Sequence, residues 1–292
     1  MIDLTSEEFL KEIRHLQLVS RHEFAGLRVG ERRTRRRGSS CEFDDYKEYD
    51  SGDDIRFIDW NLWARLDKFY IKLFASEENL NVFLLFDLSR SMDFGKSPKW
   101  DFQLRFIAAI AYLSLCNNDS TFLYPFGADL VRTAPRSHHL SDYPLIIKFL
   151  QDLTFSSHAD FEKSIDQFIA QERRRGIIFI VSDCFYELDS FDRVLRKLRW
   201  HKFDTTLIQI LAEEEINPTF LGSSRLIDSE TNKFLEMDMS LGYRDYYQEV
   251  CEKHTRDLRV LCSKYGFQFA CAQSHLQTTG FIMNLLRKGS KL

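Results

Sequence analysis

The feature that most constrains the fold is an apolar run, Asn81–Phe86, followed directly by the sequence Asp87-Leu88-Ser89-Arg90-Ser91. A continuous run of this kind is typical of a strand that is buried on both faces of a parallel sheet. Ligands of such sheets bind at the carboxyl ends of the strands. One carboxylate and two hydroxyls at alternate positions offer three hard oxygen atoms there, and these suit Mg²⁺ or a similar cation.

A second run, Gly176–Val181, ends in Ser182-Asp183 and repeats the pattern. Loops at the carboxyl ends of neighbouring parallel strands converge, so we expect Asp87, Ser89, Ser91 and Asp183 to share one crevice. The alternative is that these residues only cap the helices that follow, because Asp and Ser are ordinary helix-start residues.

Between and after these runs, strands alternate with helices of ten residues or more, which predicts an α/β fold. We expect three layers, with a mostly parallel central sheet covered by helices on both faces. Helices are expected at 97–116, 142–153, 160–174, 189–200 and 279–288, with a long helix closing at Gly266; strands are expected at 120–126, 205–211 and 267–271, and a hairpin at 225–239.

The amino-terminal part is read as an α+β extension of this fold. An amphipathic helix ends before Gly26, a charged loop follows, and the alternation of Phe69–Ala75 predicts a strand that pairs with Asn81–Phe86 as a hairpin. We therefore divide the chain into a first region, 1–78, and a second domain, 79–292.

Composition narrows the class of protein. With 292 residues, 44% hydrophobic and 29% charged, the chain can bury one large core. The net charge of -4 gives no global attraction to nucleic acid or acidic membranes. No stretch approaches the roughly 18 apolar residues of a membrane span, and no signal-peptide pattern opens the chain, so we expect a cytoplasmic protein. The six cysteines lack the spacing of a zinc site or a disulfide framework.

The motifs also carry a family resemblance. Asp-x-Ser-x-Ser after one strand and Ser-Asp after another resemble the metal-ion-dependent adhesion site (MIDAS) of von Willebrand factor A domains. Upstream, Gly38–Phe43, Tyr49–Trp60 and Ala64-Arg65 resemble the bacterial family called domain of unknown function 58, and the likeness continues through Leu226–Thr231 and the closing helices. The resemblance implies a partner, a MoxR-type AAA+ ATPase, and a role in maturing or remodelling other proteins.

One departure from the adhesion-type pattern concerns the second loop. A threonine ligand is usual there, but the matching stretch ends in Ala159-Asp160, and Ala159 cannot coordinate a metal. Thr154, Ser156 or Asp160 could substitute, or water could fill the position, since Mg²⁺ keeps several waters. We therefore expect a weakened site for Mg²⁺, or for Mn²⁺ or Ca²⁺, in which Asp87, Ser89 and Ser91 are ligands and Asp183 acts directly or through water. A carboxylate of the partner would fill the vacant position.

Three classes of function compete. The first is a binding module or adaptor that grips a partner protein through Asp87 and its neighbours. The second is a metal-dependent hydrolase or phosphatase with Asp87 as nucleophile; it is less favoured, because Ser89 stands where a second carboxylate is expected, and we assign no catalytic residue. The third is nucleic-acid binding through the basic run Arg32–Arg37, which is more often a solvated loop.

Residues of the amino-terminal region have two interpretations. Trp60 and Trp63 are expected to anchor its core. The charged residues are expected to make turn hydrogen bonds and ion pairs there. Alternatively, this surface faces the partner; the residues concerned are Asp53, Asp54, Arg56, Asp59, Trp60 and Arg65.

Overall fold

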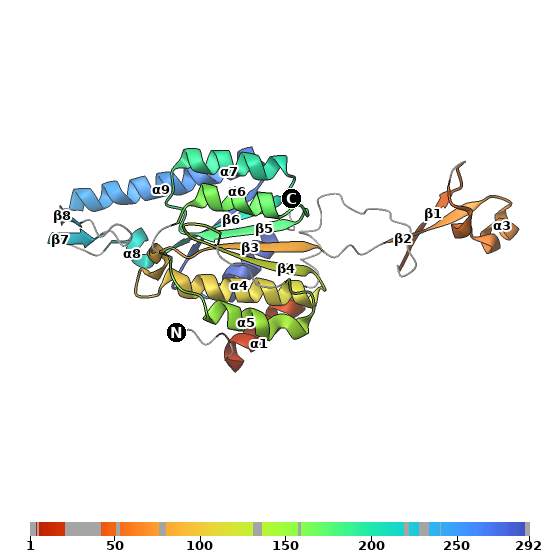
Figure 1. Ribbon diagram of the computed structural model, residues 1–292, viewed down its shortest axis with the longest axis horizontal. Coiled ribbons are helices and arrows are strands. Elements are labelled where there is room, and N and C mark those ends of the chain that lie inside the picture. Colours follow the sequence, from red (N-terminus) through yellow and green to blue (C-terminus); the bar gives the residue numbers. More distant parts are fainter. Residues whose placement is uncertain are drawn as a thin grey trace.

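A five-stranded, all-parallel sheet forms the centre of the protein (Figure 1). The computed structural model describes residues 4, 6–20, 42–50, 53–75, 80–130, 136–156, 159–218, 222–227, 234–239 and 241–289. From edge to edge the strands are β4 (Ser120–Phe126), β3 (Asn81–Asp87), β5 (Ile177–Ser182), β6 (Asp204–Leu211) and β9 (Gln268–Gln273).

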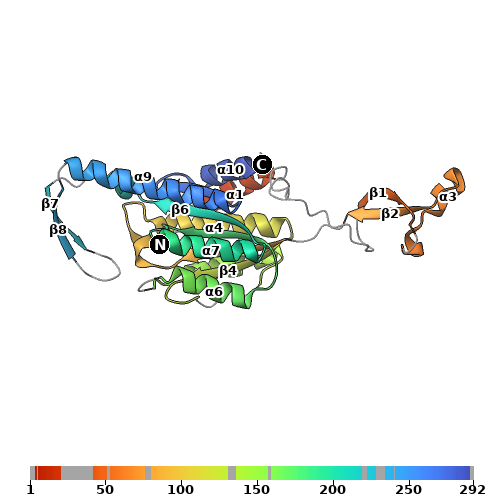
Figure 2. The same ribbon diagram turned by 90° about the horizontal axis from the view of Figure 1, so that it is seen from above.

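Helices cover both faces of the sheet, as the views in Figures 1 and 2 show. Alternate residues of β3 point to opposite faces, so Val82, Leu84 and Phe86 join one buried cluster while Phe83 and Leu85 join the other. The first cluster includes α1 (Glu7–Ser20), α4 (Lys99–Cys116), α5 (Tyr143–Gln151) and α10 (Thr278–Gly289); the second includes α6 (Phe161–Gln171), α7 (Leu188–Trp200) and α9 (Leu241–Lys264). The predicted three-layer α/β fold is confirmed.

The order of the strands reverses at β3, which makes this strand the topological switch point of the sheet. The next strand in sequence, β4, lies on one side of β3, and β5 lies on the other. Connections therefore leave the carboxyl ends of β3 and β5 in opposite directions, which is where sheets of this kind bind ligands. At the amino end of the same strand pair, Gly176 lies against β3: a Cβ atom at residue 176 would stand 2.1 Å from the main-chain oxygen of Asn81.

The amino-terminal elements after α1 form a small unit of their own, drawn apart from the central layers in Figure 1. Strands β1 (Glu42–Glu48) and β2 (Tyr70–Ala75) pair antiparallel, and the connection carries the short 3-10 helix η1 (Ile55–Phe57) and the helix α3 (Trp60–Leu66). We call these four elements the β1–β2 module. The predicted hairpin between Phe69–Ala75 and Asn81–Phe86 is wrong, because β2 pairs with β1. An alternating strand pattern predicts a strand but does not identify its partner.

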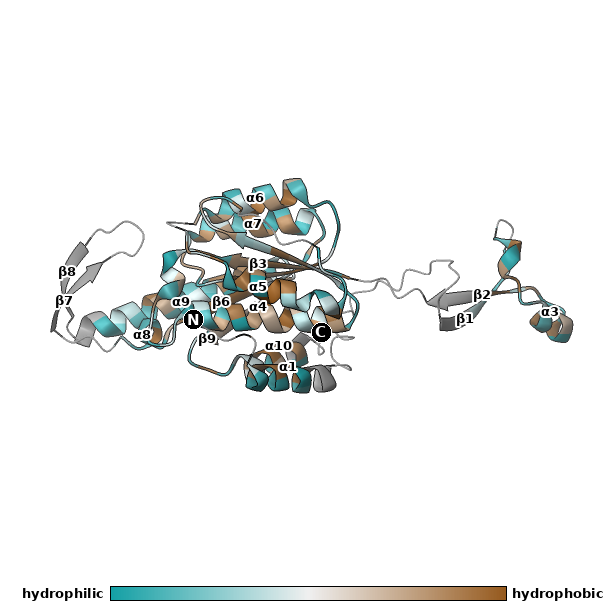
Figure 3. Cartoon of the chain, turned by 60° about the horizontal axis from the view of Figure 1, so that its bottom comes forward, coloured by the Kyte–Doolittle hydropathy of each residue, from teal (hydrophilic) through white to brown (hydrophobic). Residues whose placement is uncertain are grey.

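The expectation that Trp60 and Trp63 anchor a core is also wrong. Their exposed fractions are 59% and 40%, and Phe69, which stacks on Trp63, is 42% exposed. Hydrophobic residues of α3 appear brown in Figure 3. A seven-residue helix over two short strands offers too little apolar surface to bury rings of this size.

The helix α1 packs against α4 and α10, and its residues Phe9, Ile13 and Leu16 are buried in the core of the sheet. The division of the chain at residue 78 stays a prediction. The other predicted hairpin, at 225–239, is present. It consists of β7 (Gly222–Ile227) and β8 (Phe234–Met239), and it follows the short helix α8 (Glu213–Ile216). Among the helices that the structure describes, none has the length and apolar character needed to cross a membrane.

Candidate functional site

Asp87 is the last residue of β3, and its side chain is fully buried. Both carboxylate oxygens accept hydrogen bonds. Oδ1 accepts from the main-chain N–H of Ser89 at 2.8 Å, and Oδ2 accepts from Ser182 Oγ at 2.8 Å and from the Tyr186 hydroxyl at 2.6 Å. Ser182 closes β5, so these bonds link the carboxyl ends of the two central strands.

The environment of Asp87 favours its neutral form. Burial raises the pKa of the carboxyl group, and the nearby charge of Asp183 raises it further. The three hydrogen bonds from Tyr186, Ser89 and Ser182 oppose this change, and the resulting pKa is about 6. The protein therefore holds at this point a carboxylate that a positive charge would stabilise.

Two hydroxyl groups lie next to this carboxylate. Ser89 precedes the 3-10 helix η2 (Arg90–Asp93), and its Oγ lies 2.8 Å from the Oγ of Ser91. Ser89 is buried, whereas Ser91 is partly exposed. The two oxygens lie close enough together for one cation to be bound by both hydroxyls.

The second loop reaches the same place through Ser156. This residue forms a parallel bridge with Ser89, and its N–H donates to the main-chain oxygen of Leu88 at 2.8 Å. Its Oγ accepts from the N–H of Ala128 at 3.3 Å. Of the three substitutes suggested by the sequence, Ser156 is the one that adjoins Ser89.

The other two substitutes are placed differently. Thr154 is exposed. Asp160 caps α6, where its Oδ1 accepts from the N–H of Lys163 at 3.0 Å. Ala159, which stands where a threonine was expected, is partly buried against the cluster beneath α6 and α7.

Asp183 follows β5 and is 3% exposed. Its Oδ2 accepts from Lys99 Nζ at 2.9 Å, and its Oδ1 has a longer contact, 3.4 Å, with the N–H of Phe185. The loop turns at Cys184, a non-glycine residue in the left-handed conformation with φ of 61°. We call Asp87, Ser89, Ser91 and Asp183 the Asp87 site.

The sequence analysis missed Lys99, and with it Tyr186, Gln103 and Glu215. Lys99 opens α4, is fully buried, and also donates from Nζ to Glu215 Oε1 at 2.6 Å. Burial lowers the pKa of the ammonium group, but the charges of Asp183 and Glu215 outweigh burial and raise it. Burial raises the pKa of Glu215 in spite of Lys99. Two carboxyl groups, on Asp183 and Glu215, therefore share one ammonium group, and Asp87 lies near the charge of Asp183.

A signal for Lys99 exists in the sequence. Lys99 and Gln103 are four residues apart and in phase with Phe106 and Ile110 on α4, so two polar residues continue an apolar stripe. The side chain of Gln103 is fully buried, and its Nε2 donates to the main-chain oxygen of Asp87 at 2.7 Å. Polar residues in such a stripe indicate a buried polar partner.

The donor set fits a hard cation that keeps water ligands. No group of three or more His, Cys, Asp or Glu side chains with metal-binding geometry occurs in the described part of the chain, so a cation here would depend on the hydroxyls of Ser89 and Ser91. Asp87 and Asp183 supply negative charge beside them. Gln103 Oε1 is a buried acceptor without a partner among the described residues, which is consistent with ordered water behind the site.

Sequence comparison places the chain in a family. The pattern of the family described as "Protein of unknown function DUF58" matches residues 45–257. The chain belongs to the DUF58 family. An uncharacterized protein of Mycobacterium tuberculosis is 25% identical over 261 residues, which cover 88% of this chain and 82% of that protein.

Solved structures give loose likenesses. BatB from Bacteroides thetaiotaomicron is 14% identical with a TM-score of 0.41, covering 73% of this chain and 100% of that one. The SpRpn10 VWA domain is 11% identical with a TM-score of 0.41, covering 71% and 95%. The region matched by the DUF58 pattern contains the whole Asp87 site, Lys99 and Glu215.

The charged residues of the β1–β2 module make local contacts. Lys47 Nζ donates to Asp53 at 2.8 Å, and Arg56 pairs with Asp54 at 2.7 Å. Asp59 caps α3 by accepting from the N–H groups of the second and third residues after it, and it also accepts from the Tyr46 hydroxyl at 3.0 Å. Arg65 is exposed, and the run Arg32–Arg37 lies outside the described residues.

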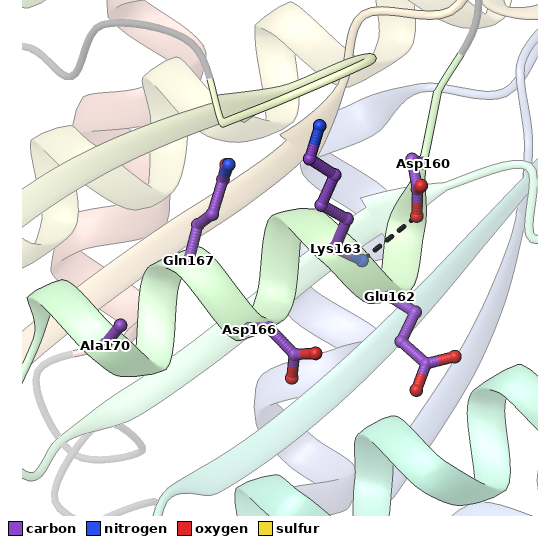
Figure 4. Close-up of a pocket in the computed structure, with 6 residues that line it drawn as sticks. All are labelled: Asp160, Glu162, Lys163, Asp166, Gln167 and Ala170. Atoms are coloured by element: carbon purple, nitrogen blue, oxygen red, sulfur yellow. Dashed lines mark hydrogen bonds between the residues drawn. The ribbon is translucent and has the colours of Figure 1, made fainter.

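A shallow hollow of about 540 Å³ lies along α6 (Figure 4), and no residue of the Asp87 site lines it. Its acidic residues Glu162 and Asp166 point to one side of the helix and pair with Lys197. Lys163 points to the other side and pairs with Asp129 at 2.6 Å. These pairings mark a solvated helix surface, and we assign no ligand to it.

Proposed function

We propose that this DUF58 protein is a non-enzymatic binding module or adaptor that holds a partner protein at the Asp87 site with the help of a divalent cation, Mg²⁺ first. The observation that carries the proposal is the hydrogen bond from Ser182 to Asp87, which joins the carboxyl ends of β5 and β3 beside the hydroxyls of Ser89 and Ser91 and near the charge of Asp183.

In this proposal, Ser89 and Ser91 bind the cation through their hydroxyls, which already lie 2.8 Å apart. Asp87 and Asp183 balance its charge, directly or through water. Because Ala159 has no side-chain oxygen, one coordination position is left for a carboxylate of the partner. The cation would supply the charge that draws this carboxylate to the site.

For the partner, we propose a MoxR-type AAA+ ATPase, which is what the family resemblance implies. An adaptor of this kind would connect the ATPase with proteins that are matured or remodelled. The exposed rings of Trp60, Trp63 and Phe69 offer a second contact surface for the same partner.

A hydrolase has less support. Asp87 is fully buried, and its two oxygens accept three hydrogen bonds, so a substrate has no open path to it as a nucleophile. Turnover of a generic phosphoester by the purified protein, lost in Asp87→Asn, would reverse this ranking. Nucleic-acid binding through Arg32–Arg37 stays a prediction, and retention on heparin that disappears when these arginines are replaced would support it.

The proposal is tested by titrating chelator-treated protein with Mg²⁺ and Mn²⁺ in a calorimeter. We expect binding by the wild type and its loss in Asp87→Ala. Asp93→Ala is the matched control, because Asp93 lies in η2 but is exposed, and it should bind as the wild type does. Equal, negligible binding by wild type and Asp87→Ala would remove the cation from the proposal.

The partner is tested by capture of the purified ATPase with immobilised protein, with and without chelator. We expect the complex to require the divalent cation and to be lost in Asp87→Ala but kept in Asp93→Ala. Capture that is indifferent to chelator and to Asp87→Ala would place the interface elsewhere, and the β1–β2 module would then be the surface to vary.

A further inference from the structure

The feature that the proposed function leaves unused is the buried cation already present in the protein. Lys99 is 0% exposed, and its Nζ lies 2.9 Å from Asp183 and 2.6 Å from Glu215. The rings of Phe94 and Phe185 lie over it, with centroids 6.0 and 5.7 Å from Nζ. An ammonium group so enclosed is a fixed part of the site.

We propose that Lys99 is a tethered cation that competes with a free divalent cation for Asp183, and that Glu215 weakens this competition by holding the other side of the ammonium group. This inference rests on the proposed function, because it concerns the affinity of the same site.

The contacts of Asp183 support competition. Its Oδ2 is engaged by Lys99, while Oδ1 makes only a 3.4 Å contact with a main-chain N–H. A divalent cation bound at Ser89 and Ser91 would attract this carboxylate, and repel the ammonium group beside it. The affinity for the cation thus depends on how readily Lys99 gives up its share of Asp183.

Glu215 makes such a transfer possible. Its carboxylate holds Lys99 at the shorter distance, 2.6 Å, and also accepts from the N–H of Ala212 at 2.8 Å, which fixes it at the start of α8. When a cation takes Asp183, Lys99 retains one buried counter-charge. Without Glu215, the ammonium group would have Asp183 alone and would bind it more firmly.

Removing the charge of Lys99 and removing the charge of Glu215 should change the affinity for a divalent cation in opposite directions. Replacing Lys99 by a neutral side chain of similar length should raise the affinity for Mn²⁺ by at least about tenfold, because a positive charge beside the site is removed. Glu215→Gln should lower the affinity. A gain of affinity is informative, because a variant that merely damages the fold would lose binding.

The experiment measures Mn²⁺ binding by electron paramagnetic resonance, with Mg²⁺ as competitor, on the full chain. The variants are Lys99→Met, Lys99→Arg, Glu215→Gln and Lys99→Met/Glu215→Gln. The double variant removes one positive and one negative charge, so it leaves fewer buried charges unpaired than Lys99→Met and remains informative if the single variant does not fold. Lys96→Met is the control, because Lys96 is an exposed lysine three residues away.

We expect tighter binding in Lys99→Met and in the double variant, weaker binding in Glu215→Gln, and no tightening in Lys99→Arg or Lys96→Met. If the wild type binds Mn²⁺ and the double variant binds it no more tightly, the inference is overturned while the proposed function stands. If neither protein binds Mn²⁺, both are overturned. Binding that appears only in the double variant, and disappears when Asp87→Ala is added, supports the inference. Lys99 would then prevent Mn²⁺ from binding in the wild type.

Discussion

The sheet and the β1–β2 module differ in which side chains they bury and which they expose. Around the sheet, charged groups are buried: Lys99 and Asp87 have no exposed surface. In the module, large rings are exposed, with Trp60 at 59%. A large core can enclose a charge when every charge has partners, whereas a hairpin with one short helix cannot enclose its own rings. The residues that the proposed function uses therefore stand out in both regions, by burial in one and by exposure in the other.

The largest expected difference between the two regions is in the stability lost when one lysine is removed from each. Lys99→Ala leaves Asp183 and Glu215 buried without a counter-charge, so the free energy of unfolding should fall by about 3–5 kcal/mol. Lys68→Ala removes an exposed pair with Glu48 at 2.8 Å and should change stability by no measurable amount. Urea unfolding followed by circular dichroism measures both, and equal losses would contradict the comparison.

A pH series examines the buried carboxyl group. The pKa of Asp87 is about 6 in the folded protein against 3.8 for the free side chain, so the folded state binds this proton more tightly. The resulting stability is present below pH 3.8 and lost as the pH rises through 6. In chelator, the free energy of unfolding of the wild type relative to Asp87→Asn should fall by roughly 2 kcal/mol between pH 4 and pH 7.

Saturating Mg²⁺ should restore part of this loss at pH 7, because a bound cation stabilises the charged carboxylate. A difference between wild type and Asp87→Asn that does not change with pH would mean that Asp87 is not held in the environment described.

A smaller effect is expected from one hydrogen bond at the same carboxylate. Tyr186→Phe removes the donor that lies 2.6 Å from Asp87 Oδ2, and this bond lowers the pKa of Asp87. Its loss should reduce stability at pH 7 by about 2 kcal/mol, and by less at pH 4, where the carboxyl group is protonated. Urea unfolding at the two pH values checks this, and an equal loss at both would mean that the Tyr186 hydroxyl does not act through the charge of Asp87.

The smallest effect is expected in the module. Trp60→Ala should change the free energy of unfolding by less than about 1 kcal/mol, because the ring is mostly exposed. Ile71→Ala, at a residue that is 2% exposed, is the matched control and should lower stability by about 2–4 kcal/mol. Amide hydrogen exchange of β1 and β2 measures both variants. If Trp60→Ala speeds amide exchange in β1 and β2 as much as Ile71→Ala does, the Trp60 ring must be buried against the module, which would contradict its exposure.

The local sequence pattern is sufficient to predict the central strands of the sheet. A strand buried on both faces needs a continuous apolar run, so β3 and β5 could be predicted, and the meeting of Asp87 with the end of β5 follows from their parallel pairing. Lys99 is harder to predict, because a lysine at a helix start is usually solvated, and only its position with Gln103 on the apolar stripe of α4 indicates that it is buried. Glu215 and Tyr186 reach the site from segments that carry no motif.

The module shows where pattern fails. The alternation in β2 indicates a strand, but its pairing with β1 depends on the path of the chain between them. Aromatic residues were assigned to a core because rings of that size usually lie in one. Whether a core exists to receive them depends on how much apolar surface the neighbouring elements supply, and local sequence does not contain that quantity.

Gly176 carries a consequence for engineering this protein. A methyl group there would meet the main chain of Asn81 and the ring of Phe83, so no other residue allows β5 to start this close to β3. Spreading the strands at that point would lengthen the span between Ser182 and Asp87 at their far ends. Gly176, six residues upstream of Ser182, would then set the strand spacing for the whole site, and Gly176→Ala would loosen the site from a distance.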